Sequence, residues 1–183
     1  MAYIPKNLNN MGLYTPDDHS GKNTHNVLAE GIKLLHEMKI QEYNHWRMEN
    51  LTITPDISGE DFSGNDLSGA YLNGVPCVRT NLSRCNLTKA NLVQADLSMA
   101  NLEGANLSEA LLMYCEMKEC NLVNADLTRA NFMWANLQDS NLTNSKILKT
   151  NFVEANLRNL KISNVNKSAA YLKYAKLEGT VWT

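Results

Sequence analysis

The sequence has little net charge and no long apolar run, and each shortage removes a class of protein. The formal net charge is −2 over 183 residues, so the chain as a whole has no strong attraction for nucleic acid or for an anionic membrane. No stretch approaches the roughly 18 consecutive apolar residues of a membrane-spanning helix. Residues 1–10 contain no apolar segment of a secretion signal. We therefore expect a soluble, cytoplasmic protein that binds neither nucleic acid nor membrane.

Cysteine is scarce, and neither cysteine nor histidine recurs in a pattern that indicates a metal site or a catalytic site. The four cysteines show no CxxC spacing, which argues against a zinc site. His36 and His45 are nine residues apart, a spacing that does not put two ligands on one face of a helix. Nucleophile motifs and glycine-rich phosphate loops are missing as well. We expect no enzymatic activity, cofactor, metal or small-molecule substrate, and we interpret the cysteines as small apolar residues, namely Cys77, Cys85, Cys115 and Cys120.

What the sequence does contain is a repeat with a period of five. Slots every five residues from Ile57 to Trp182 number 26, and 23 of them hold Leu, Ile, Phe or Met. Two residues before each of these central positions stands a small residue in most units, and the residue between the two is mostly Asn or Asp. The unit 95–99 (Ala-Asp-Leu-Ser-Met) carries the full pattern. A period of five is neither that of a helix nor that of a strand.

The repeat predicts a solenoid with a filled interior. If each unit forms one side of a square, four units make a coil of 20 residues, and the large central residue and the small residue both point inward at close-packed density. The other three residues of each unit face outward. The units 55–59, 60–64, 65–69 and 70–74 each end in a glycine, and we interpret these glycines as corner residues. Asn81, Asn101, Asn121 and Asn141 are 20 residues apart and should stack in a ladder that exchanges side-chain amide bonds.

This pattern resembles the A(D/N)LXX signature of pentapeptide-repeat proteins over residues 56–183. The resemblance implies an all-β solenoid, a right-handed quadrilateral β-helix of about six and a half coils if the 26 slots are divided by four. Two units depart from the pattern. Pro76 occupies an Asn/Asp slot, where its missing N–H removes a ladder bond. Lys167 occupies a central slot and should be turned outward by a local bulge, which is either a tolerated irregularity or the base of a site.

The first 55 residues lack the repeat and are expected to form two further segments. Residues 1–22 are read as an irregular arm, and residues 23–55 as a lead-in with one helix from His25 to about Glu49. Trp46 on that helix is the natural lid for the open end of the solenoid. The segment 43–59 also resembles the lead-in of cyanobacterial pentapeptide arrays. The apolar stripe that predicts the helix consists of Leu28, Ile32, Leu35, Tyr43 and Trp46.

Sorting the outward residues by coil side singles out one face. Three sides are polar, and one corner alternates in charge through Lys89, Glu109 and Arg129. The fourth side is apolar, which is unusual for a bare surface, and its residue types are those enriched at protein interfaces. Its outward residues are Tyr71, Val93, Leu111, Met113, Tyr114, Met133, Trp134, Val153, Tyr171 and Tyr174.

The leading hypothesis from the sequence is a non-catalytic scaffold or protein-binding module that uses this face. Its occupant is either a protein partner or second copy, or the chain's own residues 1–22. Family resemblance supplies two alternatives, a DNA mimic that modulates DNA gyrase and a secreted effector. The repeat region is nearly neutral, which argues against a DNA mimic because such a mimic needs a continuous negative surface. Residues 146–176 are rich in lysine and could instead attract an acidic partner.

Overall fold

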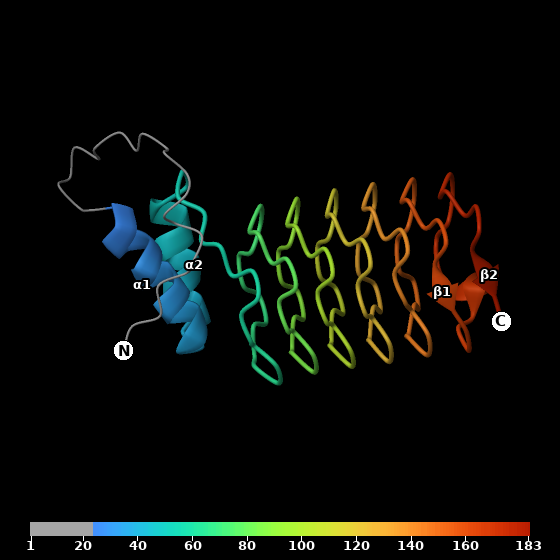
Figure 1. Ribbon diagram of the computed structural model, residues 1–183, viewed down its shortest axis with the longest axis horizontal. Coiled ribbons are helices and arrows are strands. Elements are labelled where there is room, and N and C mark those ends of the chain that lie inside the picture. Colours follow the sequence, from blue (N-terminus) through green and yellow to red (C-terminus); the bar gives the residue numbers. More distant parts are fainter. Residues whose placement is uncertain (1–23) are drawn as a thin grey trace.

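The computed structural model describes residues 24–183 and shows two helices followed by a stack of coils (Figure 1). The predicted arm, residues 1–22, lies outside the described residues. Helix α1 spans Thr24–His36 and helix α2 spans Ile40–Glu49. The elements in the last coils are strand β1 (Lys161–Ile162), the 3-10 helix η1 (Lys167–Ala169) and strand β2 (Val181–Trp182). The helices lie at one end of the stack and the C-terminus at the other.

The prediction of a single helix from His25 to Glu49 is wrong, because the chain reverses between α1 and α2. Met38 has a left-handed backbone with φ of 56°. Its N–H donates to the carbonyl of Leu35 at 3.1 Å, and the next N–H, of Lys39, donates to the carbonyl of Leu34 at 3.0 Å. This pair of bonds is a Schellman motif, which satisfies the last carbonyls of a helix and ends it. The reversal lets both helices pack on the same end of the stack.

The coils are held together by parallel β-bridges between residues 20 positions apart, such as Asn81 with Asn101 and Asn101 with Asn121. One turn of the solenoid therefore contains 20 residues, or four units. The backbone ladder repeats the same bonds at each step. The N–H of Leu102 donates to the carbonyl of Asn121 at 2.7 Å, and the N–H of Asn121 donates back to the carbonyl of Ala100 at 3.1 Å. Strands β1 and β2 continue this ladder at the far end.

The predicted interior is confirmed by burial. Leu97, Leu102 and Leu107 have no exposed surface, and the small residue Ala95 is 1% exposed. Where the small residue is a cysteine, serine or threonine, its side chain donates to a backbone carbonyl 23 residues earlier, except that the buried hydroxyl of Ser145 has no hydrogen-bond partner within residues 24–183. The thiol of Cys120 donates to Leu97 at 2.8 Å, for example. These bonds satisfy the polar groups that the narrow interior removes from water.

The outward Asn/Asp residue and the last residue of each unit shape the corner. The carboxylate of Asp96 accepts a bond from the N–H of Ser98 at 3.0 Å, which fixes the turn. The residue after that, Met99, adopts the left-handed conformation with φ of 62°. Gly59, Gly64, Gly69 and Gly74 hold the same corner position, as predicted. For a residue other than glycine, this left-handed backbone conformation is strained.

The predicted Asn ladder is present over three coils. The side-chain amide of Asn121 donates to Asn101 at 3.1 Å, and that of Asn101 donates to Asn81 at 3.4 Å. Asn81 in turn donates to Asp61 at 2.9 Å. Asn141 continues the backbone ladder through its bridge with Asn121.

Both irregular units behave as their chemistry requires. Pro76 has no N–H to donate to the preceding layer, but its carbonyl still accepts from the N–H of Ile57 at 3.0 Å and its backbone pairs with Asp96 one coil later. Lys167 is exposed and starts η1, as the predicted outward bulge requires. Its ammonium lies 5.5 Å from the ring centre of Trp182. The chain returns to register at once, since Asn151 pairs with Tyr171.

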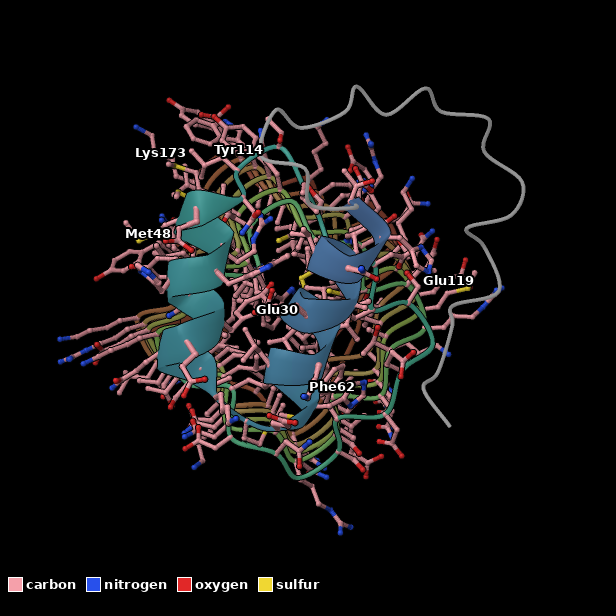
Figure 2. All side chains as sticks on the ribbon, turned by 90° about the vertical axis from the view of Figure 1, so that its left-hand side faces the viewer. Glu30, Met48, Phe62, Tyr114, Glu119 and Lys173 are labelled. Carbon is pink, nitrogen blue, oxygen red and sulfur yellow. The ribbon has the colours of Figure 1, made fainter. Side chains whose placement is uncertain are left out.

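Side chains from α2 bind the backbone of the first coil, where no preceding coil exists to do so. The amide of Asn44 donates to the carbonyl of Gly69 at 2.9 Å and accepts from the N–H of Tyr71 at 2.8 Å. The guanidinium of Arg47 donates to the carbonyls of Ile53 at 2.6 Å and Asn73 at 3.0 Å. In the view along the stack, both helices cross the end of the coils (Figure 2).

Candidate protein-binding face

The apolar face is the outward surface of the units centred on residues 72, 92, 112, 132, 152 and 172. The structure divides its ten predicted residues into two kinds. Tyr71, Leu111, Trp134, Tyr114, Tyr171 and Tyr174 are exposed, by 39% to 70%. The predicted single apolar column is partly buried, and it consists of Val93, Met113, Met133 and Val153. The aromatic side chains therefore supply most of the accessible apolar surface.

The best-defined feature of the face is a stacked pair of aromatic rings. Tyr114 and Trp134 occupy the same corner position in successive coils, and their rings lie 4.8 Å apart between centres at 12°. Both residues have φ of 60°. The coil repeat places one ring directly on the next, since the corner position recurs at about the spacing of neighbouring strands, ~4.8 Å. The pair presents one continuous aromatic edge to solvent.

The same corner column continues toward the C-terminal coils. Glu154 follows Trp134 one coil later, and Tyr174 follows Glu154. Lys173 reaches over the ring of Tyr174, with its ammonium 4.8 Å from the ring centre. A cation over an aromatic ring is attracted electrostatically. The far end of this edge therefore holds one cation, Lys173, and one carboxylate, Glu154.

A basic column runs along the opposite edge of the face. It holds Lys89, Glu109, Arg129 and Lys149, each two residues before an outward residue of the apolar face. Glu109 lies 3.8 Å from the ammonium of Lys89 and 3.6 Å from the guanidinium of Arg129, as the alternating charges predicted. The one carboxylate is shared by two cations, so the column has a net positive charge.

An apolar residue that the repeat pattern missed, Met48, extends the face onto the helical end. Met48 at the end of α2 is 62% exposed and Leu51 just after it is 79% exposed. Met48 lies on the same side of the molecule as Tyr114 and Lys173 (Figure 2). Met48 and Leu51 do not belong to the inward-packing stripe that contains Tyr43 and Trp46. This was the only sign in the sequence that they are exposed. The remaining exposed apolar residues are scattered over other sides, as expected: Met99, Leu148 and Val181.

The cysteines offer no reactive group. All four are buried, and burial raises the pKa of the Cys85 thiol to about 11 and the pKa values of the Cys115 and Cys120 thiols to about 12. A thiol is nucleophilic only as the thiolate, so these side chains act as packing groups.

Residues 24–183 contain no group of three His, Cys, Asp or Glu side chains that could hold a metal. In the same range, no helix is long and apolar enough to cross a membrane. A cleft of about 460 Å³ lies between α1 and α2 and is lined by Val27, Leu34 and Trp46 with a polar rim that includes Glu30 and Glu42.

Comparison with known proteins identifies the family. The model of pentapeptide repeats matches eight copies over residues 76–113, 105–144 and 135–166. The chain belongs to the pentapeptide-repeat family. Proteins of this family are generally structural or binding modules rather than enzymes.

Solved structures of the same class are similar to this chain. One is HetL, a pentapeptide repeat protein involved in the regulation of heterocyst differentiation in the cyanobacterium Nostoc sp. strain PCC 7120. It is 29% identical, with a TM-score of 0.57 over 67% of this chain. This chain spans 65% of HetL, less than two thirds of its length.

Two further structures are more distant in shape. A pentapeptide repeat protein of the Arabidopsis thaliana thylakoid lumen is 31% identical over 56% of this chain and 68% of its own, with a TM-score of 0.32. QnrB1, a plasmid-mediated fluoroquinolone resistance protein, is 20% identical over 68% of this chain and 78% of its own, with a TM-score of 0.42. No curated protein matches the chain.

Proposed function

We propose that this protein is a non-catalytic scaffold that binds another polypeptide on its apolar face. The observation that carries the proposal is the stacked pair of Tyr114 and Trp134, which lie in successive coils and are 51% and 40% exposed. Aromatic residues at the centre of an interface contribute a large share of binding energy. In this proposal the rod is a right-handed quadrilateral β-helix of about six and a half coils over residues 56–183, from its 26 repeat slots, and residues 23–55 cap it.

The proposal is tested by charging the face. The variant Met113→Glu with Trp134→Glu places two carboxylates in the middle of the face and leaves the interior untouched, since both side chains point outward. Met99→Glu is the matched control, because Met99 holds the same corner position on another side and is 42% exposed. Light scattering after size-exclusion chromatography measures the molar mass and so shows whether two copies associate. Affinity capture compares the proteins that bind to the wild type and to each variant.

We expect the double variant to lose the complex that the wild type forms and the Met99→Glu control to keep it. A strictly monomeric wild type would remove the version with a second copy. If the double variant keeps both the oligomeric state and the captured proteins of the wild type, the proposal is rejected.

The charge of the rod opposes the alternative of a DNA mimic. Residues 56–183 contain 12 Lys and Arg against 13 Asp and Glu, whereas replacing DNA phosphates requires a continuous negative surface. The lysines of the last coils interrupt such a surface further. A gyrase supercoiling assay should show no effect of this protein even at high concentration.

A further inference from the structure

We infer that the partner on the apolar face is an amphipathic α-helix of another protein, acidic along one flank. This inference rests on the proposed function. The first support is length. The face runs from Tyr71 to Tyr171, five steps of 20 residues, which is about 24 Å at a strand spacing of ~4.8 Å. A helix of about 16 residues has the same length at ~1.5 Å per residue.

The second support is width, which decides between a helix and a second copy of the chain. From Asn131 to Trp134 the face spans three residue steps, about 10 Å at ~3.3 Å per step. A helix with its side chains is about 10–12 Å across. The strip is then about 240 Å² in projection, whereas a stable interface buries roughly 800 Å² on each partner. Two rods paired by this strip alone would fall short of that area, while the width of the strip matches one helix.

The third support is spacing along the rod. Apolar side chains recur on the face at every coil, about every 4.8 Å. Along a helix, residues three and four apart on one side are about 4.5 Å and 6 Å apart in rise. A stripe of such residues therefore meets successive rungs of the face. The half-buried column of Val93, Met113, Met133 and Val153 forms the floor, and the ring edges of Tyr114 and Trp134 form one wall.

The fourth support is charge, which sets the orientation of the helix. On the basic edge, Glu109 is shared by Lys89 and Arg129, and Lys149 follows one coil later. The opposite edge carries Glu154 and Lys173, and Glu116 beside it lies 3.9 Å from the ammonium of Lys118, so this edge has no net charge. A helix with acidic residues on the flank that faces Lys149 would be favoured by complementary potentials, which act mainly on specificity and association rate.

The test uses a display library of random 20-residue peptides, selected on the full-length protein and counter-selected on the variant with Met113→Glu and Trp134→Glu. We expect enriched peptides to carry apolar residues at helical spacing with Asp or Glu along one flank. They should gain helical circular dichroism on binding. Lys149→Glu should weaken their Kd about fivefold, as loss of one exposed ion pair allows. Lys161→Glu on another side should leave it unchanged.

The outcomes separate the inference from the proposal beneath it. Face-dependent peptides that alternate apolar and polar residues, or that contain proline, would overturn the helix and leave the binding face intact. If the wild type forms dimers that Trp134→Glu breaks, and no helical peptide is enriched, the helix is likewise overturned and the binding face stays. If no peptide and no dimer depends on the face, for instance because residues 1–22 occupy it, both statements fall.

Discussion

Replacing Arg47 by methionine should loosen the joint between the helices and the first coil. Arg47 is 6% exposed. Its guanidinium donates to the carbonyls of Ile53 and Asn73 at 2.6 Å and 3.0 Å, so it ties α2 both to the lead-in and to the coil. Methionine keeps most of the apolar stem and removes both donors. The variant therefore isolates the hydrogen bonds from the packing.

The expected loss follows from these two bonds. A hydrogen bond from a charged donor contributes about 1.5–3 kcal/mol, and an unsatisfied buried acceptor costs a similar amount. Both contacts are only partly buried, so water can reach the freed carbonyls and the lower end of the range applies. We expect a loss of about 3 kcal/mol. Because a solenoid is stabilised by local units and their nearest neighbours, the loss should be concentrated at the helical end.

Two measurements check this expectation. Urea denaturation followed by circular dichroism gives the free energy of unfolding. Amide hydrogen exchange locates the effect by comparing the N–H of Gly74, which is bonded to Val93 at 2.9 Å, with that of Leu142, which is bonded to Lys161 at 2.7 Å. Protection should fall at Gly74 and stay the same at Leu142.

The conservative variant Arg47→Lys is the control. A lysine keeps the charge but presents a single nitrogen, so it reaches one carbonyl at a time and should lose about half as much stability. A methionine variant with the wild-type urea midpoint and wild-type exchange at Gly74 would refute the assignment of Arg47 as a structural tie.

Four further outcomes are expected. Gly31→Ala should lower the melting temperature, because an added Cβ would lie 2.4 Å from the ring of Trp46. Overpacking costs about 1–3 kcal/mol, which outweighs the gain in helix propensity of about 1 kcal/mol. A higher melting temperature would contradict this contact. Lys167→Leu should raise the free energy of unfolding by about 1 kcal/mol, since leucine can fill the interior slot that lysine leaves, and a lower urea midpoint would count against this. Burial raises the pKa of Cys120 to about 12 from an ordinary 9.0, so the native thiol should resist disulfide reagents at pH 8 and react only in denaturant. Unfolded thiols release their protons first, so stability should fall as the pH rises above 9.0, which denaturation at pH 8 and pH 10 would detect. Trp134→Gly should keep the melting temperature within a few degrees, since glycine suits the corner with φ of 60°, yet abolish binding of a helical peptide selected on the wild-type protein, as a titration would show.

The coils could be predicted in detail because a strict period fixes the direction of every side chain. Once Leu97 is assigned to the interior, Ala95 must be small, Asp96 must face outward and Met99 must turn the corner. The structure bears out each of these assignments. The period also predicted how Lys167 departs from the pattern, since a lysine cannot remain unpaired in a filled interior.

The helical end could not be predicted to the same depth, because no period links its residues to the coils. The left-handed turn at Met38 depends on bonds to Leu34 and Leu35, and methionine is not a residue that signals such a turn. The bonds of Asn44 and Arg47 to the first coil depend on where α2 lies after that turn. Nothing in the sequence around Asn44 and Arg47 indicates that these two side chains bind the first coil.

The corner of the apolar face holds two residues, Tyr114 and Trp134, that the fold tolerates but does not require. A left-handed corner costs an ordinary side chain about 1–2 kcal/mol relative to glycine, and this chain uses glycine at the same place in its first coil, at Gly74. Tyr114 and Trp134 accept that cost and recover only about 0.5–1.5 kcal/mol from stacking on each other. Neither residue fills the interior, and neither completes the backbone ladder with its side chain. Their net effect on stability is therefore close to zero or negative, whereas each exposes a large aromatic edge at one side of a narrow apolar strip. Lys89, Met99 and Arg129 have left-handed corners as well, so the fold tolerates many side chains there and gives no reason for two aromatic ones in successive coils. Binding of a partner does, and it predicts that changes at this corner affect affinity and stability in opposite directions.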